Sequence, residues 1–410
     1  MDSLRLAWKN LWRNRRRTLI TLTAIAFSIM LVQASHNLSF GVYERMVDSG
    51  VRAGSGHMAI YRDGYLDGRD EKLDFTVGTL VEQVENLEGV STVLPRLYIP
   101  GLAQSSRESR GILLLGVDPA RERQANPFLR ELSDEEWLRA SSSRDAIIGW
   151  RLMDELQIRP GQKFVVTAQH TDGTLHAELL RIRGVVKSGI KDVDSSLIMV
   201  GRERAALLSG QGDRIHELAI ILQTAKLDRQ VFPLVSKMID VRRDIRAVAW
   251  EEAMPNLANA IKLDYASQNF IFLVILAIVT IGVVNTLLMS VMERLHEFGV
   301  ILALGSTPLR LRATILIEAC LLGGSAAILG SILGTLLTWY LWAVGINMET
   351  FISGSLEFGG VIFDPVMRAT WDIVWMVKIA LYVAGLTLLA ALYPAIKAGR
   401  ITPVEAMRHH

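Results

Sequence analysis

Long runs without acidic or basic residues constrain this chain more than any other feature. A helix needs about 20 predominantly apolar residues to cross the hydrocarbon core of a bilayer. Residues 18–43, 265–292 and 379–396 hold no Asp, Glu, Lys or Arg, and residues 313–348 hold only Glu318. The sequence therefore predicts four transmembrane helices, and four buried helices of a large soluble protein are the alternative. The predicted spans are 18–40, 268–292, 312–342 and 373–396.

Composition agrees with a membrane protein and excludes several other classes. Half of the 410 residues are hydrophobic and the mean hydropathy is +0.29, which is high for a soluble domain that must also cover its surface. The formal net charge is only +2, so bulk charge does not indicate nucleic-acid binding. A single cysteine excludes a disulfide framework and a cysteine-based zinc site.

The first apolar run has two interpretations. Arg15, Arg16 and Arg17 precede it and would suit the basic flank of a cleaved signal peptide. However, the sequence Val32-Gln33-Ala34 is a poor cleavage site, and the apolar stretch continues past it to Phe40. We favour an uncleaved span. The stretch 1–17 before it predicts a short amphipathic helix at the membrane surface, with Leu4, Trp8, Leu11 and Trp12 along one side.

Basic residues predict the orientation of the spans. They cluster before the first span, in the loop 293–311 and in the tail 397–410. The charged residues of the loop 343–372 are, in contrast, mostly acidic. Short loops rich in Lys and Arg stay in the cytoplasm. Both termini and the 293–311 loop are therefore expected to be cytoplasmic. Trp339, Trp342, Trp371 and Trp375 bracket the 343–372 loop, as an outer interfacial belt would.

Residues 41–267 form a large polar block between the first two spans. Its ends repeat a pattern of strand, helix and strand: one copy starts at His57 and the other at Leu218. Two such units can interleave into a ferredoxin-like α/β layer. The middle, about 100–212, alternates apolar runs with turn signals and predicts a β-rich insertion. It also holds two expected helices, at 133–139 and 150–156. The fold class is thus an α-helical membrane protein with a large α+β domain outside the cytoplasm.

The loop 293–311 predicts a helix that lies between two spans. Leu295, Phe298 and Leu302 share one helical face, Gly305 ends the helix, and Pro308 follows it. Such a helix either transmits force from a soluble partner or merely connects the spans. The sequence contains no P-loop, no H-E-x-x-H and no G-x-S-x-G motif. It therefore predicts no catalytic site and no metal site in this chain.

Two segments resemble a known family. The pattern Glu293-Arg294-x-x-Glu297-Phe298-Gly299-x-x-x-Ala303-Leu304-Gly305 and the ending Tyr393-Pro394-Ala395…Pro403-Val404-Glu405-Ala406 are similar to those of MacB-like (FtsX-type, type VII) ABC transporter permeases. The order of one span, a large outer domain and three spans also matches. Within this family the chain most resembles the lipoprotein-releasing LolC/LolE permeases.

The resemblance implies a permease that works by mechanotransmission. Its expected partners are two copies of a cytoplasmic ATPase that binds ATP and Mg, a second permease, identical or paralogous, a lipidated substrate protein and a periplasmic carrier. Export of a peptide or amphiphile with an adaptor, and FtsX-like signalling to an outer hydrolase, are the alternatives. The residues expected to contact the ATPase are Glu293, Arg294, Glu297, Phe298, Leu302 and Gly305.

Three further expectations concern the spans. A laterally open groove for acyl chains is expected along the first two spans, where ordinary lipid-facing surface is the alternative; its residues would be Phe27, Met30, Leu31, Phe270, Leu273 and Leu276. Gly330 and Gly334 form a G-x-x-x-G pair that predicts close helix packing, within the chain or at a dimer interface. Glu318 predicts a structural tie to Arg294, Arg310 or Arg312, and proton coupling is the alternative. The sequence does not tell whether His409 and His410 are native.

Overall fold

The computed structural model describes residues 2–126, 129–130, 132–187, 191–350, 357–358, 361–362 and 366–399. The chain divides into two compact units, which we call the span unit and the sheet unit. The span unit comprises residues 1–43, 263–352 and 366–410, and the sheet unit comprises residues 44–262 and 353–365. The motif residues Pro403-Val404-Glu405-Ala406 and the two terminal histidines lie outside the described residues.

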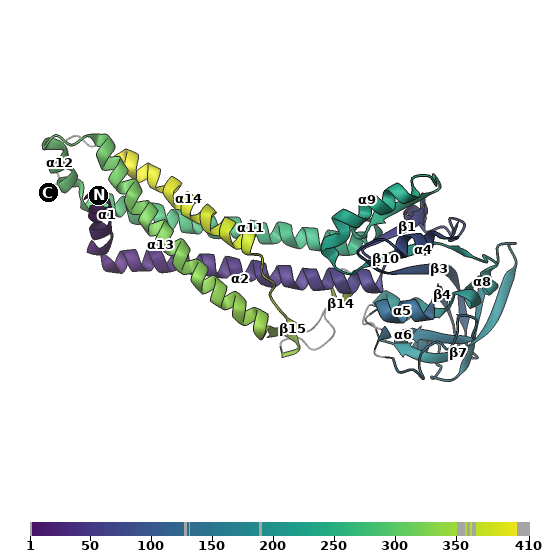
Figure 1. The fold of residues 1–410 in the computed structure, drawn as a ribbon. Helices are drawn as coiled ribbons and strands as arrows, with labels where there is room; N and C mark the ends of the chain where they lie inside the picture. Colours follow the sequence, from purple (N-terminus) through teal and green to yellow (C-terminus); the bar gives the residue numbers. More distant parts are fainter. Residues whose placement is uncertain are drawn as a thin grey trace. The chain divides into compact units, whose positions relative to one another are not determined.

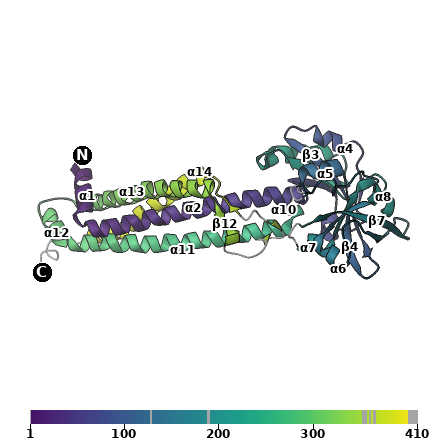
Figure 2. The ribbon, with the colours of Figure 1, turned by 90° about the horizontal axis from the view of Figure 1, so that it is seen from below.

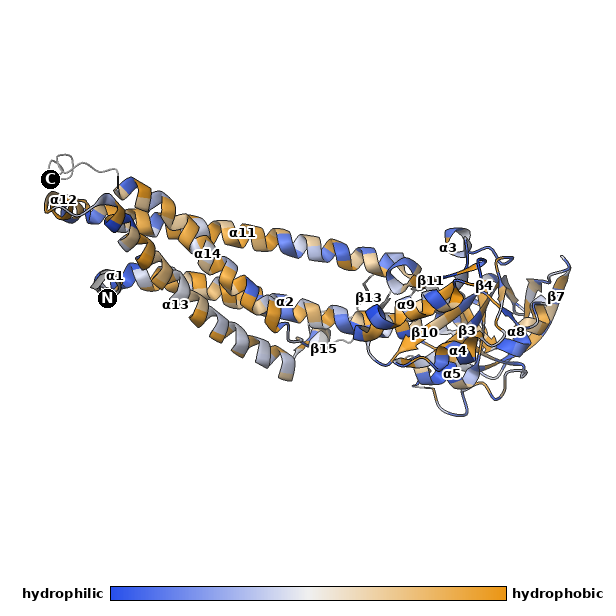
Figure 3. Ribbon diagram, turned by 45° about the horizontal axis from the view of Figure 1, so that its top comes forward, coloured by the Kyte–Doolittle hydropathy of each residue, from blue (hydrophilic) through white to orange (hydrophobic). Residues whose placement is uncertain are grey.

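Within the described residues, four helices are long and apolar enough to cross a membrane: α2 (Arg15–Ala53), α11 (Pro255–Glu293), α13 (Pro308–Ala343) and α14 (Ile373–Ala398) (Figure 1). Figure 3 shows hydrophobic residues along α11, α13 and α14. Helices α2 and α11 are longer than the predicted spans, because the helices continue into polar sequence where hydropathy alone marks no end. Two shorter helices, α1 (Asp2–Arg13) and α12 (Leu295–Ala303), lie at the same end of the span helices (Figures 1 and 2).

Small residues allow the four long helices to pack closely. An added Cβ on Gly330 of α13 would lie 2.7 Å from the carbonyl oxygen of Ala26 in α2, and one on Gly334 would collide with Gln33. The predicted glycine pair therefore packs against α2 of the same chain. All four helices contribute to one apolar core, which consists of Ile25, Ile29, Val283, Leu287, Ala319, Ala326, Val383, Ala390 and Ala391.

One half of the sheet unit is a ferredoxin-like layer. Its strands are β1 (Met58–Arg62), β3 (Val90–Gln104), β10 (Glu217–Leu222) and β11 (Ile245–Ala249). They pair in the antiparallel order β11-β1-β10-β3. This order interleaves the two copies of the repeated pattern. Helices α4 (Leu80–Glu85) and α9 (Asp228–Ile239) pack on this layer through buried residues that include Val84, Val231 and Val235.

The other half of the sheet unit is a closed barrel. The second half of β3 pairs with β4 (Ser109–Val117) and with β6 (Lys163–Gln169), and the ring continues through β8 (Leu197–Gly201), β5 (Asp145–Gly149) and β7 (Leu175–Val186). The insertion is β-rich, as predicted, but its closure depends on pairing between β3 and β6 across about 65 residues, which no local pattern indicates. Its helices are α5 (Pro119–Ala125), α6 (Trp150–Glu155), α7 (Lys191–Ser196) and α8 (Arg202–Ser209).

The predicted helix at 133–139 is wrong. Glu136 Oε2 accepts a hydrogen bond from the Ser133 backbone N–H at 3.0 Å, as in one half of a capping box, but only turns and bends follow. Trp137 and Leu138 are instead drawn into an apolar cluster with Val117.

The remaining elements are short. They are α3 (Tyr65–Gly68), β2 (Phe75–Thr76), β9 (Arg214–Ile215), η2 (Ala225–Leu227), α10 (Trp250–Ala253), β12 (Ile346–Asn347), η3 (Met348–Thr350), β13 (Glu357–Phe358), β14 (Val361–Ile362) and β15 (Val366–Met367).

Candidate functional site

The α12 helix begins and ends where its sequence signals place it. Gly305 has a φ of +92°, a conformation that favours glycine, and it follows directly after the last helical turn. The side-chain oxygen of Thr307 then accepts a hydrogen bond from the Arg310 backbone N–H, and Pro308 is the first residue of α13. These two signals separate α12 sharply from the next span.

The predicted apolar face of α12 is directed into the chain itself. Phe298 is only 2% exposed and packs against Leu311, Ile315, Ala395 and Ala398 of α13 and α14. Leu302 is half-buried in the same cluster. Within the chain, Phe298 therefore fixes α12 to the spans, and the expectation that Phe298 and Leu302 contact a partner stays a prediction.

Exposed apolar side chains that the sequence prediction missed lie in and directly after α12. Val300 and Ile301 of α12 are exposed, Leu304 directly after α12 is 83% exposed, and Leu309 in the first turn of α13 is 74% exposed. Exposed apolar side chains that lie close together can form a surface that another protein buries. We call these four residues the α12 patch. The signal that could have revealed it is Leu304 directly before Gly305, where no further helical turn remains to cover it.

Ion pairs hold α12 and the end of α11 to α1 and α2. Arg13 Nη1 lies 2.7 Å from Glu297 Oε1, and Arg17 Nη1 lies 2.9 Å from Glu293 Oε2. Both pairs are exposed, so water screens them and each contributes little to stability, of order 0–1 kcal/mol. Glu293 and Glu297, which were expected to contact a partner, thus contact the N-terminal helices of their own chain.

A buried ion pair joins the start of α12 to α13. Arg294 Nη1 lies 2.9 Å from Glu318 Oε1, and both side chains are less than 10% exposed. The guanidinium carbon of Arg294 also lies 5.0 Å from the ring centre of Phe298. Arg294 is one of the three partners expected for Glu318. The pair ties the start of α12 to α13, and removal of either buried partner would leave the other one without its counter-charge.

The predicted groove residues lie on two helices that contact each other. Helices α2 and α11 meet at Val32 and Phe272, and the Thr21 hydroxyl lies 2.9 Å from that of Thr286. Four of the predicted residues are exposed in the chain: Phe27, Leu31, Phe270 and Leu273. Met30 and Leu276 are half-buried, and Leu276 packs into the common core of the spans. The geometry thus offers apolar surface on both helices, and a groove for acyl chains stays a prediction.

Polar side chains meet at the other end of the spans. Asn37 Nδ2 donates to Thr338 Oγ1 at 3.2 Å, and the Asp372 backbone N–H donates to Asn37 Oδ1 at 3.2 Å. His36 stacks on Trp375 with ring centres 3.7 Å apart. These contacts tie α2 to α13 and α14.

The sheet unit also contains a buried ionic cluster. Arg96 is 1% exposed; its Nη2 lies 2.6 Å from Glu122 Oε1, and its Nη1 lies 3.1 Å from Glu217 Oε1. The hydroxyls of Tyr61 and Tyr98 donate to Glu217 at 2.5 and 3.1 Å. Burial, and then the charge of Glu217, raise the pKa of both tyrosines, so they remain donors. No sequence signal singled out Arg96, a lone base within an apolar strand.

Among the described residues, His170, Asp172 and His176 form a group with the chemistry of metal ligands. Their nearest ligand atoms all lie within 4.8 Å of one another on the β6–β7 hairpin. The sequence shows scattered histidines, and the hairpin brings these two together. Exposed groups of this kind occur commonly without an ion, and we assign no function to it.

Comparison with known proteins shows which permeases the chain resembles. The model of the FtsX-like permease C-terminal family matches residues 269–403, a segment that includes α12 and the last two spans. LolC, the lipoprotein-releasing system transmembrane protein of Neisseria meningitidis serogroup B, is 24% identical over 355 residues, which cover 84% of each chain. The chain is thus similar to permeases of the MacB-like, FtsX type. Its four apolar helices and these permease relatives together support a multi-pass inner-membrane protein.

Two further proteins are similar to this chain. The macrolide export ATP-binding/permease protein MacB of Nitrosomonas europaea is 24% identical over 404 residues, which cover 88% of this chain and 56% of MacB. Among solved structures, the periplasmic region of MacB from Actinobacillus actinomycetemcomitans matches with a TM-score of 0.36 and 13% identity, over 50% of this chain and 93% of that region.

Proposed function

We propose that this FtsX-type permease couples ATP hydrolysis by a separate cytoplasmic ATPase to the extraction of lipoproteins from the outer leaflet of the inner membrane. The observation that carries the proposal is α12, a short helix that is clamped to the spans on one side and exposes an apolar patch on the other. The relative named as part of a lipoprotein-releasing system supports the substrate class.

The proposal requires both termini and α12 to be cytoplasmic. The cluster of basic residues before the first span and in the 293–311 loop supports this orientation. Cysteine labelling tests it after Cys320 is replaced by alanine. A cysteine at Ser106, exposed in the sheet unit, should react with a membrane-impermeant reagent added to intact spheroplasts, and a cysteine at Ala303 on α12 should not. Reaction at Ala303 from outside would overturn the orientation.

The α12 patch is the proposed contact with the ATPase. A short helix that places apolar side chains in a partner's groove is a common mode of recognition. Leu304 has the largest exposed fraction of the four patch residues, 83%, and is the proposed anchor. A photo-crosslinking amino acid at position 304 should therefore capture the ATPase in the membrane complex. The same amino acid at Val241, which is 90% exposed in the sheet unit, is the matched control and should not capture it.

The contacts that hold α12 to the other helices of the span unit would transmit force from the ATPase. The buried Arg294–Glu318 pair ties α12 to α13, Phe298 ties it to α13 and α14, and two exposed ion pairs tie the junction to α1 and α2. A displacement of α12 by the ATPase would therefore be passed to all these helices. Catalysis itself is assigned to the partner, which would bind ATP and Mg.

The substrate is the finer part of the proposal. The exposed apolar residues Phe27, Leu31, Phe270 and Leu273 would face acyl chains that enter sideways from the membrane, with a second permease, identical or paralogous, closing the groove. The substitution Phe27→Asp or Leu273→Asp should block the entry of acyl chains, since a charge in an apolar groove costs a few kcal/mol.

Reconstitution distinguishes this substrate from the alternatives. The permease is purified with its ATPase and incorporated into liposomes that contain a triacylated lipoprotein, and ATP-dependent transfer to a soluble periplasmic carrier is measured. Transfer by the parent and its loss in Leu273→Asp support lipoprotein release. Transport of a small amphiphile instead, with an adaptor protein present, would support a MacB-like exporter; activation of an outer hydrolase without any transport would support FtsX-like signalling.

A further inference from the structure

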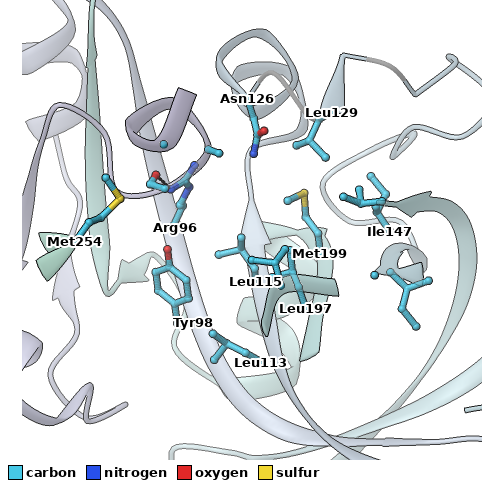
Figure 4. Close-up of a pocket in the computed structure, with 17 residues that line it drawn as sticks. Arg96, Tyr98, Leu113, Leu115, Asn126, Leu129, Ile147, Leu197, Met199 and Met254 are labelled. Carbon is cyan, nitrogen blue, oxygen red and sulfur yellow. Dashed lines mark hydrogen bonds between the residues drawn. The ribbon is translucent and has the colours of Figure 1, made fainter. Parts of the chain in front are cut away.

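An apolar cavity of about 270 Å³ lies inside the sheet unit (Figure 4). The barrel strands β4 and β8 form much of its wall, where Leu113 pairs with Leu197 and Leu115 pairs with Met199. Protein interiors normally contain few voids larger than a water molecule. A space of this size, lined mostly by apolar side chains with Arg96, Tyr98 and Asn126 among them, is not explained by the packing of the barrel.

The polar groups at one side of the cavity already have partners. Arg96 and Tyr98 line that side in Figure 4, but the arginine is paired with Glu122 and Glu217 and the tyrosine hydroxyl donates to Glu217. One arginine and two carboxylates give this cluster a formal charge of −1. It offers no attraction to an anionic group, so the space favours an uncharged, apolar occupant.

The volume limits the size of the occupant. Apolar cavities of about 150 Å³ stay dry and bind one benzene ring, whereas sites for drug-sized ligands span about 300–1,000 Å³. The cavity therefore has room for one hydrocarbon chain and not for a whole lipid. A flexible chain also suits the part of the wall formed by Leu, Ile, Val and Met, whose side chains adapt to an irregular occupant, while Tyr98 and Asn126 lie at other points of the lining.

The cavity also touches the ends of two long helices. Gly50 and Ala53 of the last turns of α2 line it, as does Met254, the residue directly before α11. The Met254 sulfur lies so close to Gly54 that an added Cβ there would be 2.6 Å from it. An occupant would therefore contact the last turns of α2 and the start of α11.

We propose that this cavity binds one alkyl chain of an amphiphile, with the methyl end inside and the polar end at the opening. The proposal does not depend on lipoprotein release, since it concerns the chain of any amphiphile. The chain could belong to a free lysolipid or to an acylated protein, and both present the same hydrocarbon.

Photo-labelling of the full chain in nanodiscs tests the proposal without ATPase or ATP. The probe is a lysophosphatidylcholine whose acyl chain carries a diazirine near its methyl end, and labelled peptides are identified by mass spectrometry. Label should appear on the β4 and β8 peptides that contain Leu115 and Met199. It should fall at least tenfold in the presence of excess unlabelled lysolipid. Absence of label on these peptides, or label that excess lysolipid does not reduce, would overturn the proposal.

Variants that fill the cavity give a second reading. Leu115→Trp and, as a milder change, Ile147→Phe should reduce labelling of the β8 peptide at least tenfold, while Leu207→Trp on the exposed face of α8 should not. Retained labelling in a folded filled variant would contradict the proposal. Competition on the parent chain separates the two sources: an acylated peptide that displaces the probe at lower concentration than lysolipid indicates an acylated protein, and the reverse order indicates a free lipid.

Discussion

In the described part of the chain, two arginines are buried in ionic clusters, and they differ in how many buried carboxylates they contact. Arg96 in the sheet unit has two buried carboxylates as partners and also donates to the Gly54 carbonyl. Arg294 at the α12 junction has one buried carboxylate, Glu318, and a weaker contact of 3.4 Å with the exposed Glu297. Both carboxylate partners of Arg96 are buried, whereas one of the two carboxylate partners of Arg294, Glu297, is exposed to water.

This difference separates a rigid support from a part that can move. The Arg96 cluster fixes α5, β3 and β10 in one arrangement, since any displacement would leave a buried charge unpaired. The Arg294 tie holds α12 through one strong pair, an aromatic contact and exposed ion pairs that cost little to break. Elements that move during function come from the less stable parts of a structure. We therefore expect α12 to shift more readily than the sheet unit deforms.

The largest effect is expected from Arg96→Ala. The change leaves Glu122 and Glu217 buried without their cation, which should lower the free energy of unfolding of the sheet unit by about 3–5 kcal/mol. Thermal or denaturant unfolding of the full chain in detergent measures it, with the exposed Arg107→Ala as the matched control. A loss below about 1 kcal/mol would remove the contrast between the two arginines.

A pH titration tests the stability of the sheet unit at another buried group, His57. Burial lowers the pKa of His57 from 6.5 to about 4. Because the folded pKa lies below the unfolded one, the unfolded state binds more protons between these values. The shifted pKa of His57 contributes roughly 3 kcal/mol to the free energy of unfolding. This contribution is complete above pH 6.5 and is lost as the pH falls toward 4.

The variant His57→Asn should remove that pH dependence. Its side-chain oxygen can still accept the Leu222 backbone N–H that His57 Nδ1 accepts at 3.2 Å. Unfolding of the parent and of the variant is followed from pH 7 to pH 4. An identical slope in both would show that His57 does not titrate on unfolding.

A smaller effect is expected from Glu318→Gln. The side chain keeps its size and can still accept a hydrogen bond, but Arg294 loses its buried counter-charge, so about 2 kcal/mol of stability should be lost at the junction. Stimulation of the ATPase should also fall, since α12 is held less firmly to α13. Hydrogen exchange localises the change: faster exchange in α12 is expected, with unchanged exchange in the barrel. Faster exchange in the barrel as well would contradict the separation of the two regions.

The smallest effect is expected at the Arg13–Glu297 pair. Both partners are about half exposed, so a double-mutant cycle of Arg13→Ala and Glu297→Ala should give a coupling energy of at most about 0.5 kcal/mol. Unfolding midpoints of the two single variants and the double variant supply the cycle. A coupling above about 2 kcal/mol would mean that the junction is clamped as firmly as the sheet unit.

The sequence predicted those features that local patterns determine. The four apolar runs, the ends of α12 at Gly305 and Pro308, and the glycines that pack against α2 all depend on residues near one another or on helical spacing. The repeated strand–helix–strand pattern also predicted the layer formed by β1, β3, β10 and β11. The partner of Glu318 was narrowed to three arginines, because a charge near the end of a span needs a counter-charge within reach.

The rest depends on contacts between distant residues. The spacing of Leu295, Phe298 and Leu302 reveals an apolar face, but spacing cannot tell whether that face meets α13 and α14 or a partner. The same limit applies to Arg96, whose carboxylates come from α5 and β10, and to the cavity, whose walls come from several strands. The predicted groove residues could be placed on their helices, but a groove between chains needs the second permease.

The most direct test of the account is ATP hydrolysis by the complex of permease and ATPase with Leu304→Asp. A charge at the centre of the α12 patch should weaken ATPase binding at least tenfold, or about 1.4 kcal/mol, and abolish stimulation of hydrolysis. Val241→Asp, at an equally exposed site in the sheet unit, should behave like the parent. If Leu304→Asp binds the ATPase and stimulates hydrolysis like the parent, α12 is only a connector and the proposed coupling is wrong.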